Sequence, residues 1–278
     1  MPVWRFGYQA NCWGPLGGHP VGVTSIKDLT YKTFGDIDVA CVEIAAAGYS
    51  GVEIFDGNLV DYPGGPGALA TRLAELELTL IAVYSGANFV FPDVLGEELA
   101  RIDKVAALAA EAGASHLVVG GGAKRTVAAT DEDYRRLGEA LGRVVGIAAR
   151  HGLEAHYHPH LTTLAETPEQ VARVLSLSPI HFCPDTGHLA AAGGNAAAMI
   201  DQHFQRVHYV HLKGWQREPF AFTPLDRGDL DLKPVIDTLH RRGFAGWITV
   251  ELDAWPSPRA GAEASRAWLR QAIDGRRS

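Results

Sequence analysis

Eight short apolar or β-prone runs recur along the chain, and helix-like sequence lies between them. The runs cover residues 5–10, 51–55, 79–84, 116–120, 153–158, 180–184, 207–212 and 247–252. The stretches between them are rich in alanine and leucine with helical periodicity, as in 99–112 and 134–150, and several end in Ala-Gly, His-Gly or Arg-Gly. Glycine is the residue that most often ends a helix in this way. The order helix, glycine, strand predicts parallel strands joined by crossover helices.

Eight such strands are the number that a closed β/α barrel requires. We therefore predict a (β/α)8 TIM barrel and a single domain over residues 1–278. The chain length of 278 residues suits this fold, which needs about 250. A doubly wound open sheet is the alternative, but no glycine-rich dinucleotide turn follows the first run, and the triplet Gly120–Gly122 lacks the G-x-G-x-x-G spacing.

Four polar clusters follow apolar runs in the second half of the chain. They are HYHPH (156–160), PDTGH (184–188), HYVHLK (208–213) and VELD (250–253). Because the carboxyl ends of barrel strands converge on one site, these clusters are expected to meet in space. Histidine, aspartate and glutamate are the donors that hold a divalent metal, so the sequence predicts a metal-dependent enzyme.

Three residues are the strongest candidate metal ligands. Asp185 closes the sixth run, and the alternation of strand side chains directs His211 to the opposite side from His208. Glu251 is a lone carboxylate between apolar neighbours, which is costly to bury unless it is paired or metal-bound. The competing interpretations are a helix cap for Asp185 and a buried salt bridge to an arginine for Glu251.

Other polar residues receive supporting or structural roles. Lys213 shares a face with His211 and is expected to polarise a carbonyl or stabilise an enolate oxygen. Glu154 comes too early in the fifth run and is assigned to the barrel floor, and His208 is assigned a structural role. Residues near strand ends are expected to bind substrate, although each is also compatible with ordinary packing: Asn11, Trp13, Glu53, His188 and Trp215.

Composition narrows the class of protein. A formal charge of -7 gives no electrostatic footprint for nucleic acid. The three cysteines are odd in number and form no C-x-x-C pair, which suggests neither a disulfide framework nor a thiolate site. No apolar stretch approaches the roughly 18 residues of a membrane span. We expect a cytoplasmic protein with no nucleic-acid or membrane partner, and a homo-oligomer is compatible with the sequence.

The clusters resemble the xylose-isomerase-like TIM barrels of sugar isomerases and epimerases, and within them an inosose dehydratase-like branch. The resemblance extends from CWG and AAAGYSGVEIF through YHPHLTTLAETPEQ, DTGHLAAAGGN and VHLK to RGDLDLKPVIDTLHRRGFAGWITVEL. It implies a divalent metal, with Mn2+ or Co2+ first and Zn2+ or Mg2+ as alternatives, held by a Glu, Asp, His, Glu set. The last three positions fall on Asp185, His211 and Glu251.

The first ligand position is where the sequence departs from the isomerase pattern, because His158 stands where those enzymes carry glutamate. Either His158 is the ligand or Glu166 reaches back to replace it, and we favour Glu166 on sequence grounds. His158 and His160 then become acid/base or substrate-binding groups.

The histidine pair favours a lyase that acts on a polyhydroxy ketone. We predict metal-assisted enolate formation and β-elimination of water from a keto-cyclitol or keto-sugar. A ketose isomerase or epimerase is the alternative, as is a lyase that cleaves a 3-keto-glycoside. Two other classes are less consistent with the sequence. A DNA-cleaving AP endonuclease suits the acidic charge poorly, and a non-catalytic sugar sensor would not need the ligand residues.

Overall fold

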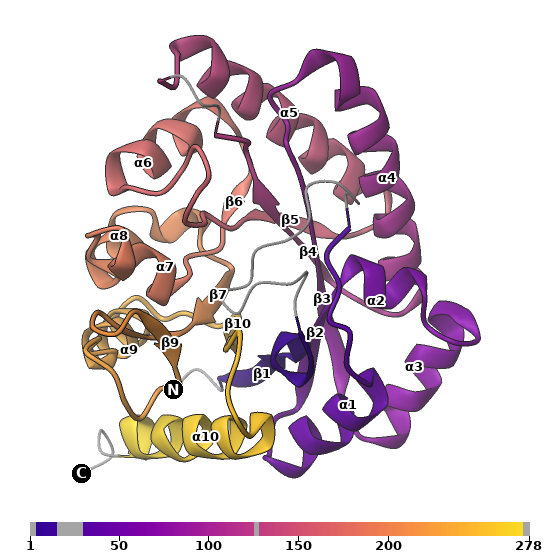
Figure 1. The fold of residues 1–278 in the computed structure, drawn as a ribbon, viewed down its shortest axis with the longest axis vertical. Coiled ribbons are helices and arrows are strands. Elements are labelled where there is room, and N and C mark those ends of the chain that lie inside the picture. Colours follow the sequence, from indigo (N-terminus) through magenta and orange to yellow (C-terminus); the bar gives the residue numbers. More distant parts are fainter. Residues whose placement is uncertain (1–3, 16–29, 125–127, 275–278) are drawn as a thin grey trace.

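The computed structural model describes residues 4–15, 30–124 and 128–274, and these form a nearly closed barrel of eight parallel strands (Figure 1). All eight predicted strands are present: β1 (Arg5–Gln9), β2 (Gly51–Phe55), β3 (Thr79–Ala87), β4 (His116–Gly121), β5 (Glu154–Tyr157), β6 (His181–Phe182), β7 (Tyr209–Leu212) and β10 (Trp247–Val250). Their order in the sheet is β6-β5-β4-β3-β2-β1-β10-β7, and every neighbouring pair is parallel.

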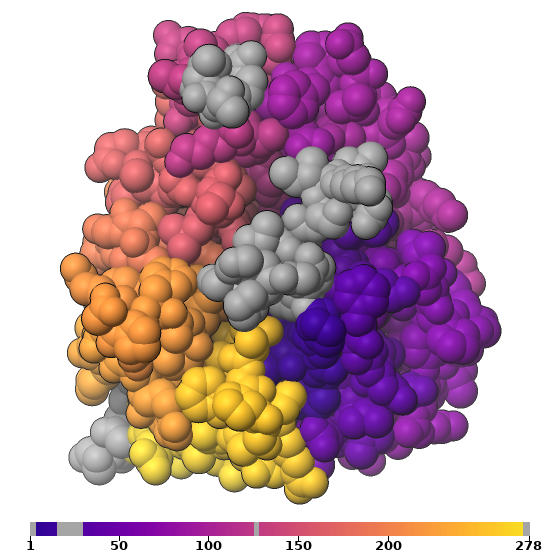
Figure 2. All heavy atoms as spheres, viewed as in Figure 1, coloured from indigo at the N-terminus to yellow at the C-terminus, as the bar shows by residue number. Residues whose placement is uncertain are grey.

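The seam of the barrel lies between β6 and β7, which form no hydrogen-bonded ladder among the described residues. A single parallel bridge between Asp185 and His211 spans this seam, where the His211 N–H donates to the Pro184 carbonyl at 3.0 Å. On the opposite side β1 pairs with β10, and Figure 2 shows the indigo N-terminal part directly against the yellow C-terminal part. The closure brings residues from both ends of the chain into one barrel.

Helices surround the strands on the outside (Figure 1). They are α1 (Ile37–Ala46), α2 (Asp56–Val60), α3 (Gly65–Glu75), α4 (Pro92–Glu111), α5 (Asp131–Arg150), α6 (Pro168–Leu177), α7 (Thr186–Ala191), α8 (Ala196–Gln202), α9 (Lys233–Arg241) and α10 (Pro258–Asp274), with short 3-10 turns η1 (Ala10–Trp13) and η2 (Phe204–Arg206). Thr130 and Thr167 begin α5 and α6 with capping boxes that satisfy free backbone N–H groups.

The expected glycine helix ends are confirmed by the backbone. Gly48, Gly113, Gly152 and Gly243 have φ angles of 88°, 88°, 75° and 71°. Glycine adopts this left-handed conformation without the steric cost that a side chain would add. Each of these turns precedes the next strand, so the chain returns to the sheet at the amino end of the barrel.

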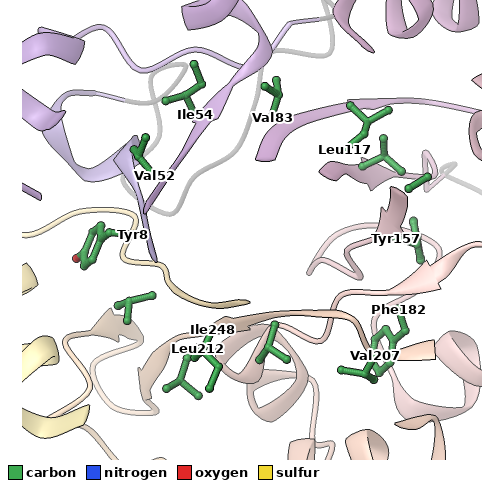
Figure 3. Close-up of a cluster of buried hydrophobic side chains, with 14 of the residues drawn as sticks. Tyr8, Val52, Ile54, Val83, Leu117, Tyr157, Phe182, Val207, Leu212 and Ile248 are labelled. Carbon is green, nitrogen blue, oxygen red and sulfur yellow. The ribbon is translucent and has the colours of Figure 1, made fainter. Parts of the chain in front are cut away.

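The main hydrophobic core lies between the sheet and the helices. Strand side chains such as Val52, Val83 and Leu117 pack there (Figure 3). Buried side chains of the helices belong to the same cluster. A smaller apolar cluster, which includes Ile81 and Tyr209, belongs to the alternate strand positions. Among the described residues, no helix combines the length and apolar character that crossing a membrane requires. An antiparallel hairpin of β8 (Gly214–Gln216) and β9 (Ala221–Thr223) follows β7 and was absent from the sequence prediction.

Candidate metal centre

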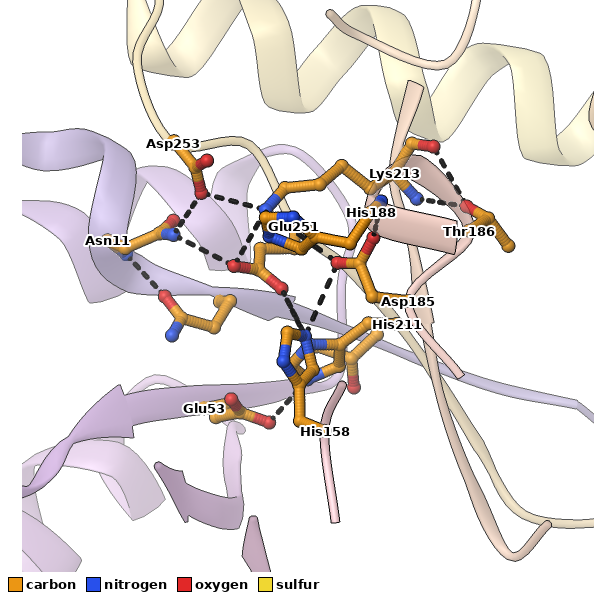
Figure 4. Close-up of polar contacts among 12 residues, drawn as sticks. Asn11, Glu53, His158, Asp185, Thr186, His188, His211, Lys213, Glu251 and Asp253 are labelled. Carbon is orange, nitrogen blue, oxygen red and sulfur yellow. Dashed lines mark hydrogen bonds and ion pairs between the residues drawn. The ribbon is translucent and has the colours of Figure 1, made fainter. Parts of the chain in front are cut away.

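Four side chains converge at the carboxyl end of the barrel, and every one is buried (Figure 4). His158 directly follows β5, and Asp185 lies three residues beyond β6 as the N-cap of α7. His211 belongs to β7, and Glu251 directly follows β10. Each position follows from where its strand ends, because the parallel order directs all four termini to the same mouth.

The facing atoms of the four residues lie close together. His158 Nε2 is 3.4 Å from Asp185 Oδ2 and 3.5 Å from Glu251 Oε2, and Glu251 Oε2 is 2.6 Å from His211 Nδ1. Within the described parts of the chain, none of these four atoms makes a contact of good hydrogen-bond geometry, although they form close ion pairs with one another. Buried polar atoms are nearly always satisfied, so a convergent, unsatisfied set of two imidazole nitrogens and two carboxylate oxygens fits a divalent cation.

Burial and charge act in opposite directions on these groups. Burial opposes the charged form of His211, but Glu53 and Glu251 outweigh it and raise its pKa to about 10. Burial likewise opposes the charge on Glu251, and the cations of Lys213 and His211 reverse the effect and hold its pKa well below the usual range. Positive charge at this point is therefore strongly favoured by the surrounding carboxylates.

Glu53 holds His211 from the side away from the other ligand candidates. Its Oε2 accepts from Tyr209 Oη at 2.6 Å and lies 2.9 Å from His211 Nε2. A carboxylate that accepts the second N–H of an imidazole fixes the ring so that the other nitrogen faces a metal. These two protein contacts occupy Oε2, whereas the buried Oε1 of Glu53 has no hydrogen-bond partner among the described residues. The substrate contact expected of Glu53 from the sequence stays a prediction.

Lys213 lies at the centre of three carboxylates. Its Nζ is 2.9 Å from Asp253 Oδ1, 3.0 Å from Glu251 Oε1 and 3.6 Å from Asp185 Oδ2. Burial opposes its charge, but these carboxylates outweigh that effect and raise the pKa of Lys213. Thr186 exchanges hydrogen bonds of 2.8 Å with the backbone N–H and carbonyl of Lys213, which fixes the start of the side chain.

Asp253 is a site residue that the sequence interpretation did not select. Burial raises its pKa to about 7, and the ammonium of Lys213 opposes that rise. The signal was available, because Asp253 follows Glu251 by two residues and therefore shares its side of the chain. Asn11 joins this group from η1, since its amide donates to Asp253 Oδ1 at 3.1 Å and to Glu251 Oε1 at 3.3 Å.

Comparison with known proteins identifies the family. The sequence model of the xylose isomerase-like TIM barrel matches residues 41–272. This chain belongs to that family. Inosose dehydratase of Glaesserella parasuis serovar 5 is 28% identical over 87% of this chain and 91% of that protein. Inosose dehydratase of Bacillus licheniformis is 33% identical over 46% of this chain.

The matched regions differ in extent from one relative to another. The chain spans about half the length of the Bacillus licheniformis protein, 49%, and 55% of the inosose dehydratase of Lactiplantibacillus plantarum. Among solved structures, L-ribulose 3-epimerase superposes with a TM-score of 0.79 at 19% identity, over 99% of this chain and 96% of that one. At this identity the likeness shows the shared fold.

Within this xylose isomerase-like barrel, the structure does not bring Glu166 to the convergent group. The Glu166 carboxylate is 2.8 Å from Lys124 Nζ and accepts from the Thr162 backbone N–H. His158 lies in the group instead, together with Asp185, His211 and Glu251.

Two further imidazoles, those of His160 and His188, lie beside the four-residue group in this xylose isomerase-like barrel. The ring centroids of His160 and His188 are 3.8 Å apart, and His188 Nε2 is 3.3 Å from Lys213 Nζ. Burial, followed by the charge of His158, lowers the pKa of His160 to about 4. Burial also lowers the pKa of His188, assisted by His160 and Lys213. The lowered pKa values favour the neutral form of both rings, which has one unprotonated nitrogen.

The two candidate tryptophans differ in their surroundings. The indole N–H of half-buried Trp13 donates to Glu43 of α1 at 2.6 Å, which ties it to the outer helix layer. Trp215 on β8 is 9% exposed, and its indole nitrogen has no partner among the residues that the structure describes. Trp215 therefore retains a donor for a ligand, whereas the donor of Trp13 is occupied.

Proposed function

We propose that this chain is a divalent-metal-dependent carbon–oxygen lyase that removes water from a keto-cyclitol or keto-sugar. The observation that carries the proposal is the convergence of four unsatisfied, buried donor atoms from His158, Asp185, His211 and Glu251. The similarity to inosose dehydratase of Glaesserella parasuis over most of both chains supports a dehydratase in particular.

His158, rather than Glu166, is the fourth ligand in this proposal. His158 Nε2 lies within 3.5 Å of the facing oxygens of Asp185 and Glu251, whereas Glu166 is bound to Lys124. Two imidazoles and two carboxylates suit Mn2+, Co2+ or Zn2+ better than Mg2+, which prefers oxygen donors. Mn2+ and Co2+ remain our first choices.

The chemistry divides between the cation and the protein. A divalent ion held by these four residues would act as a Lewis acid on the ketone oxygen and acidify the adjacent C–H bond. His160 is neutral and accepts that proton, and the electron pair left on the α-carbon expels the β-hydroxyl. The proton carried by His160 passes to the departing oxygen, so the products are an unsaturated ketone and water. Lys213 stabilises negative charge on the substrate oxygens.

The substrate groups that this mouth can recognise are hydroxyls and a carbonyl. The unpaired amide oxygen of Asn11 and the indole N–H of Trp215 are an acceptor and a donor without partners among the described residues. His188 lies beside the Lys213 ammonium, and its Nδ1 has no hydrogen-bond partner among the described residues. A polyhydroxy ketone matches this mixture of donors, acceptors and rings.

The test is an assay of the metal-stripped protein with an inosose, before and after addition of Mn2+ or Co2+. Metal-dependent loss of water, seen by mass spectrometry and by absorbance of the unsaturated ketone, supports the proposal. Interconversion of two ketoses of equal mass would assign the chain to the epimerases, and release of an aglycone from a 3-keto-glycoside would assign it to the glycoside lyases. Activity that is unchanged by chelation would overturn the metal requirement.

His160→Gln separates the proposed base from the metal site. We expect kcat to fall by about 100-fold or more, since general bases contribute 10²–10⁴-fold, while the affinity for Mn2+ stays near the wild-type value. His151→Gln is the matched control, because His151 is a partly exposed histidine at the end of α5 whose partner is Asp103. Equal activity of the two variants would remove His160 from the mechanism.

A further inference from the structure

A second cluster of histidines lies at the opposite end of the barrel. His116, Glu154 and His181 are the first residues of β4, β5 and β6, and His208 directly precedes β7. His156 is the third residue of β5, paired in register with His181. These positions are at the amino ends of the strands, so the cluster forms part of the barrel floor, and none of the five residues takes part in the proposed reaction.

One carboxylate oxygen is the centre of this floor cluster. Glu154 Oε2 lies 3.3 Å from His208 Nδ1, 3.7 Å from His116 Nδ1 and 3.9 Å from His156 Nε2. His116 Nδ1 and His156 Nε2 are themselves 3.0 Å apart. Donor atoms around a tetrahedral ion with bonds of about 2.1 Å are spaced by roughly 3.4 Å, and these separations bracket that value.

Two imidazoles and a carboxylate are the donor types of such a site. Neutral imidazoles and deprotonated carboxylates are the species that bind a transition ion. His156 is fully buried, and its ring centroid is 4.9 Å from that of His116.

The floor cluster is accessible to solvent on one side and contains the negative charge of Glu154, and both features suit the binding of a cation. The side chain of Glu154 is 48% exposed and that of His208 is 41% exposed, so one side of the cluster is open. Glu154 supplies the negative charge that a cation site needs. Arg5, whose charge contributes to the lowered pKa of His116, is the opposing cation, and its guanidinium stacks over Trp247 with 4.5 Å to the ring centroid.

We propose that the barrel floor binds a borderline divalent transition ion such as Zn2+, held by His116, Glu154 and His156, with His208 as the next donor around the same carboxylate. This site is separate from the candidate metal centre at the mouth and is structural. It joins β4 and β5 to the segment that enters β7, and so crosses the seam where β6 and β7 form no ladder among the described residues. A bound ion would hold the barrel closed at that seam.

Zinc titration of tag-free, metal-stripped protein tests the floor site. We compare wild type with Glu154→Gln, at a side chain that is 48% exposed, and with His116→Gln, at a side chain that is 12% exposed and stays polar in the variant. His151→Gln is again the control. It removes a histidine that lies 2.8 Å from a carboxylate, that of Asp103, but this pair has no second imidazole beside it as the floor cluster has. Calorimetry gives the number of ions bound, and a thermal melt with and without Zn2+ gives the stabilisation.

The expected result is that wild type and His151→Gln bind one more equivalent of Zn2+ than the two floor variants, or bind it at least about tenfold more tightly. Their melting temperatures should also rise more on addition of Zn2+. Equal stoichiometry, affinity and thermal shift in all four proteins would overturn the proposal and leave a neutral pair of hydrogen-bonded imidazoles. Because the floor variants leave every mouth residue in place, this outcome is independent of the lyase assay.

Discussion

Replacing Lys213 by methionine tests whether the buried carboxylates of the mouth depend on a protein cation. The ammonium lies within 3.6 Å of Asp253, Glu251 and Asp185, and the side chain is fully buried. Methionine keeps an unbranched apolar stem but removes the charge, which leaves these acids without their common partner. Breaking a buried ion pair in this way costs about 3–5 kcal/mol. For a chain of this length, that is a fall in Tm of about 6–10 °C.

Lys124→Met is the matched control, with the same substitution in an exposed ion pair. Lys124 Nζ is 2.8 Å from Glu166, and its side chain is 51% exposed. Such a pair contributes less than about 1 kcal/mol. Both variants would be unfolded by urea and by heat in the presence of a chelator, so that no added ion replaces the lost charge. If Lys213→Met lost no more stability than Lys124→Met, the role assigned to Lys213 as counter-ion would be refuted.

Three further substitutions probe other parts of the structure. Glu53→Gln should weaken Mn2+ binding by about 10–100-fold, because it alters the acceptor that orients His211, and an unchanged calorimetric affinity would contradict that role. His151→Gln should raise the pKa of Asp103, which the hydrogen bond from His151 lowers. An NMR titration of Asp103 in the variant should therefore show a higher midpoint. Because the pKa is lowered in the folded protein, this carboxylate stabilises the fold at pH values above its ordinary pKa near 4, and the stabilisation is lost as the pH falls. Gly120→Ala would place a Cβ 2.0 Å from a buried tyrosine hydroxyl of β3 and should cost about 1–3 kcal/mol by urea denaturation, whereas a neutral result would mean that the tyrosine moves freely.

The fold was predictable because most strands begin and end close to the limits of an apolar run in the sequence. β2 matches the predicted run 51–55, and β4 and β10 differ from their predicted ranges by one or two residues at one end. Glycine at each helix end supplied the second signal, since the positive φ at Gly48 and Gly243 is what the turn requires. The β8–β9 hairpin was missed because its three-residue strands are too short to show a period.

The fourth ligand was harder to choose, because the preference for Glu166 rested on how a loop folds. His158 directly follows β5, so the strand fixes its position. Glu166 lies eight residues further along, beyond a turn in which Thr162 has a φ of 69°. The carboxylate of Glu166 closes that turn on the Thr162 N–H. A backbone conformation of this kind is rare for threonine, and sequence patterns give no means of anticipating it.

The cluster HYHPH contributes to both ends of the barrel, and the reason is the two-residue period of a strand. His156 and His158 project into the same interior but at different heights along β5. His156 therefore meets His116 at the floor, at 3.0 Å between ring nitrogens, while His158 meets Asp185 at the mouth, at 3.4 Å. Tyr209 lies between the two levels, with its ring near His156 and its hydroxyl bound to Glu53. His156 and His158, only two residues apart in the sequence, thus belong to two separate clusters. An interpretation of HYHPH as one ligand set therefore misses the cluster at the floor.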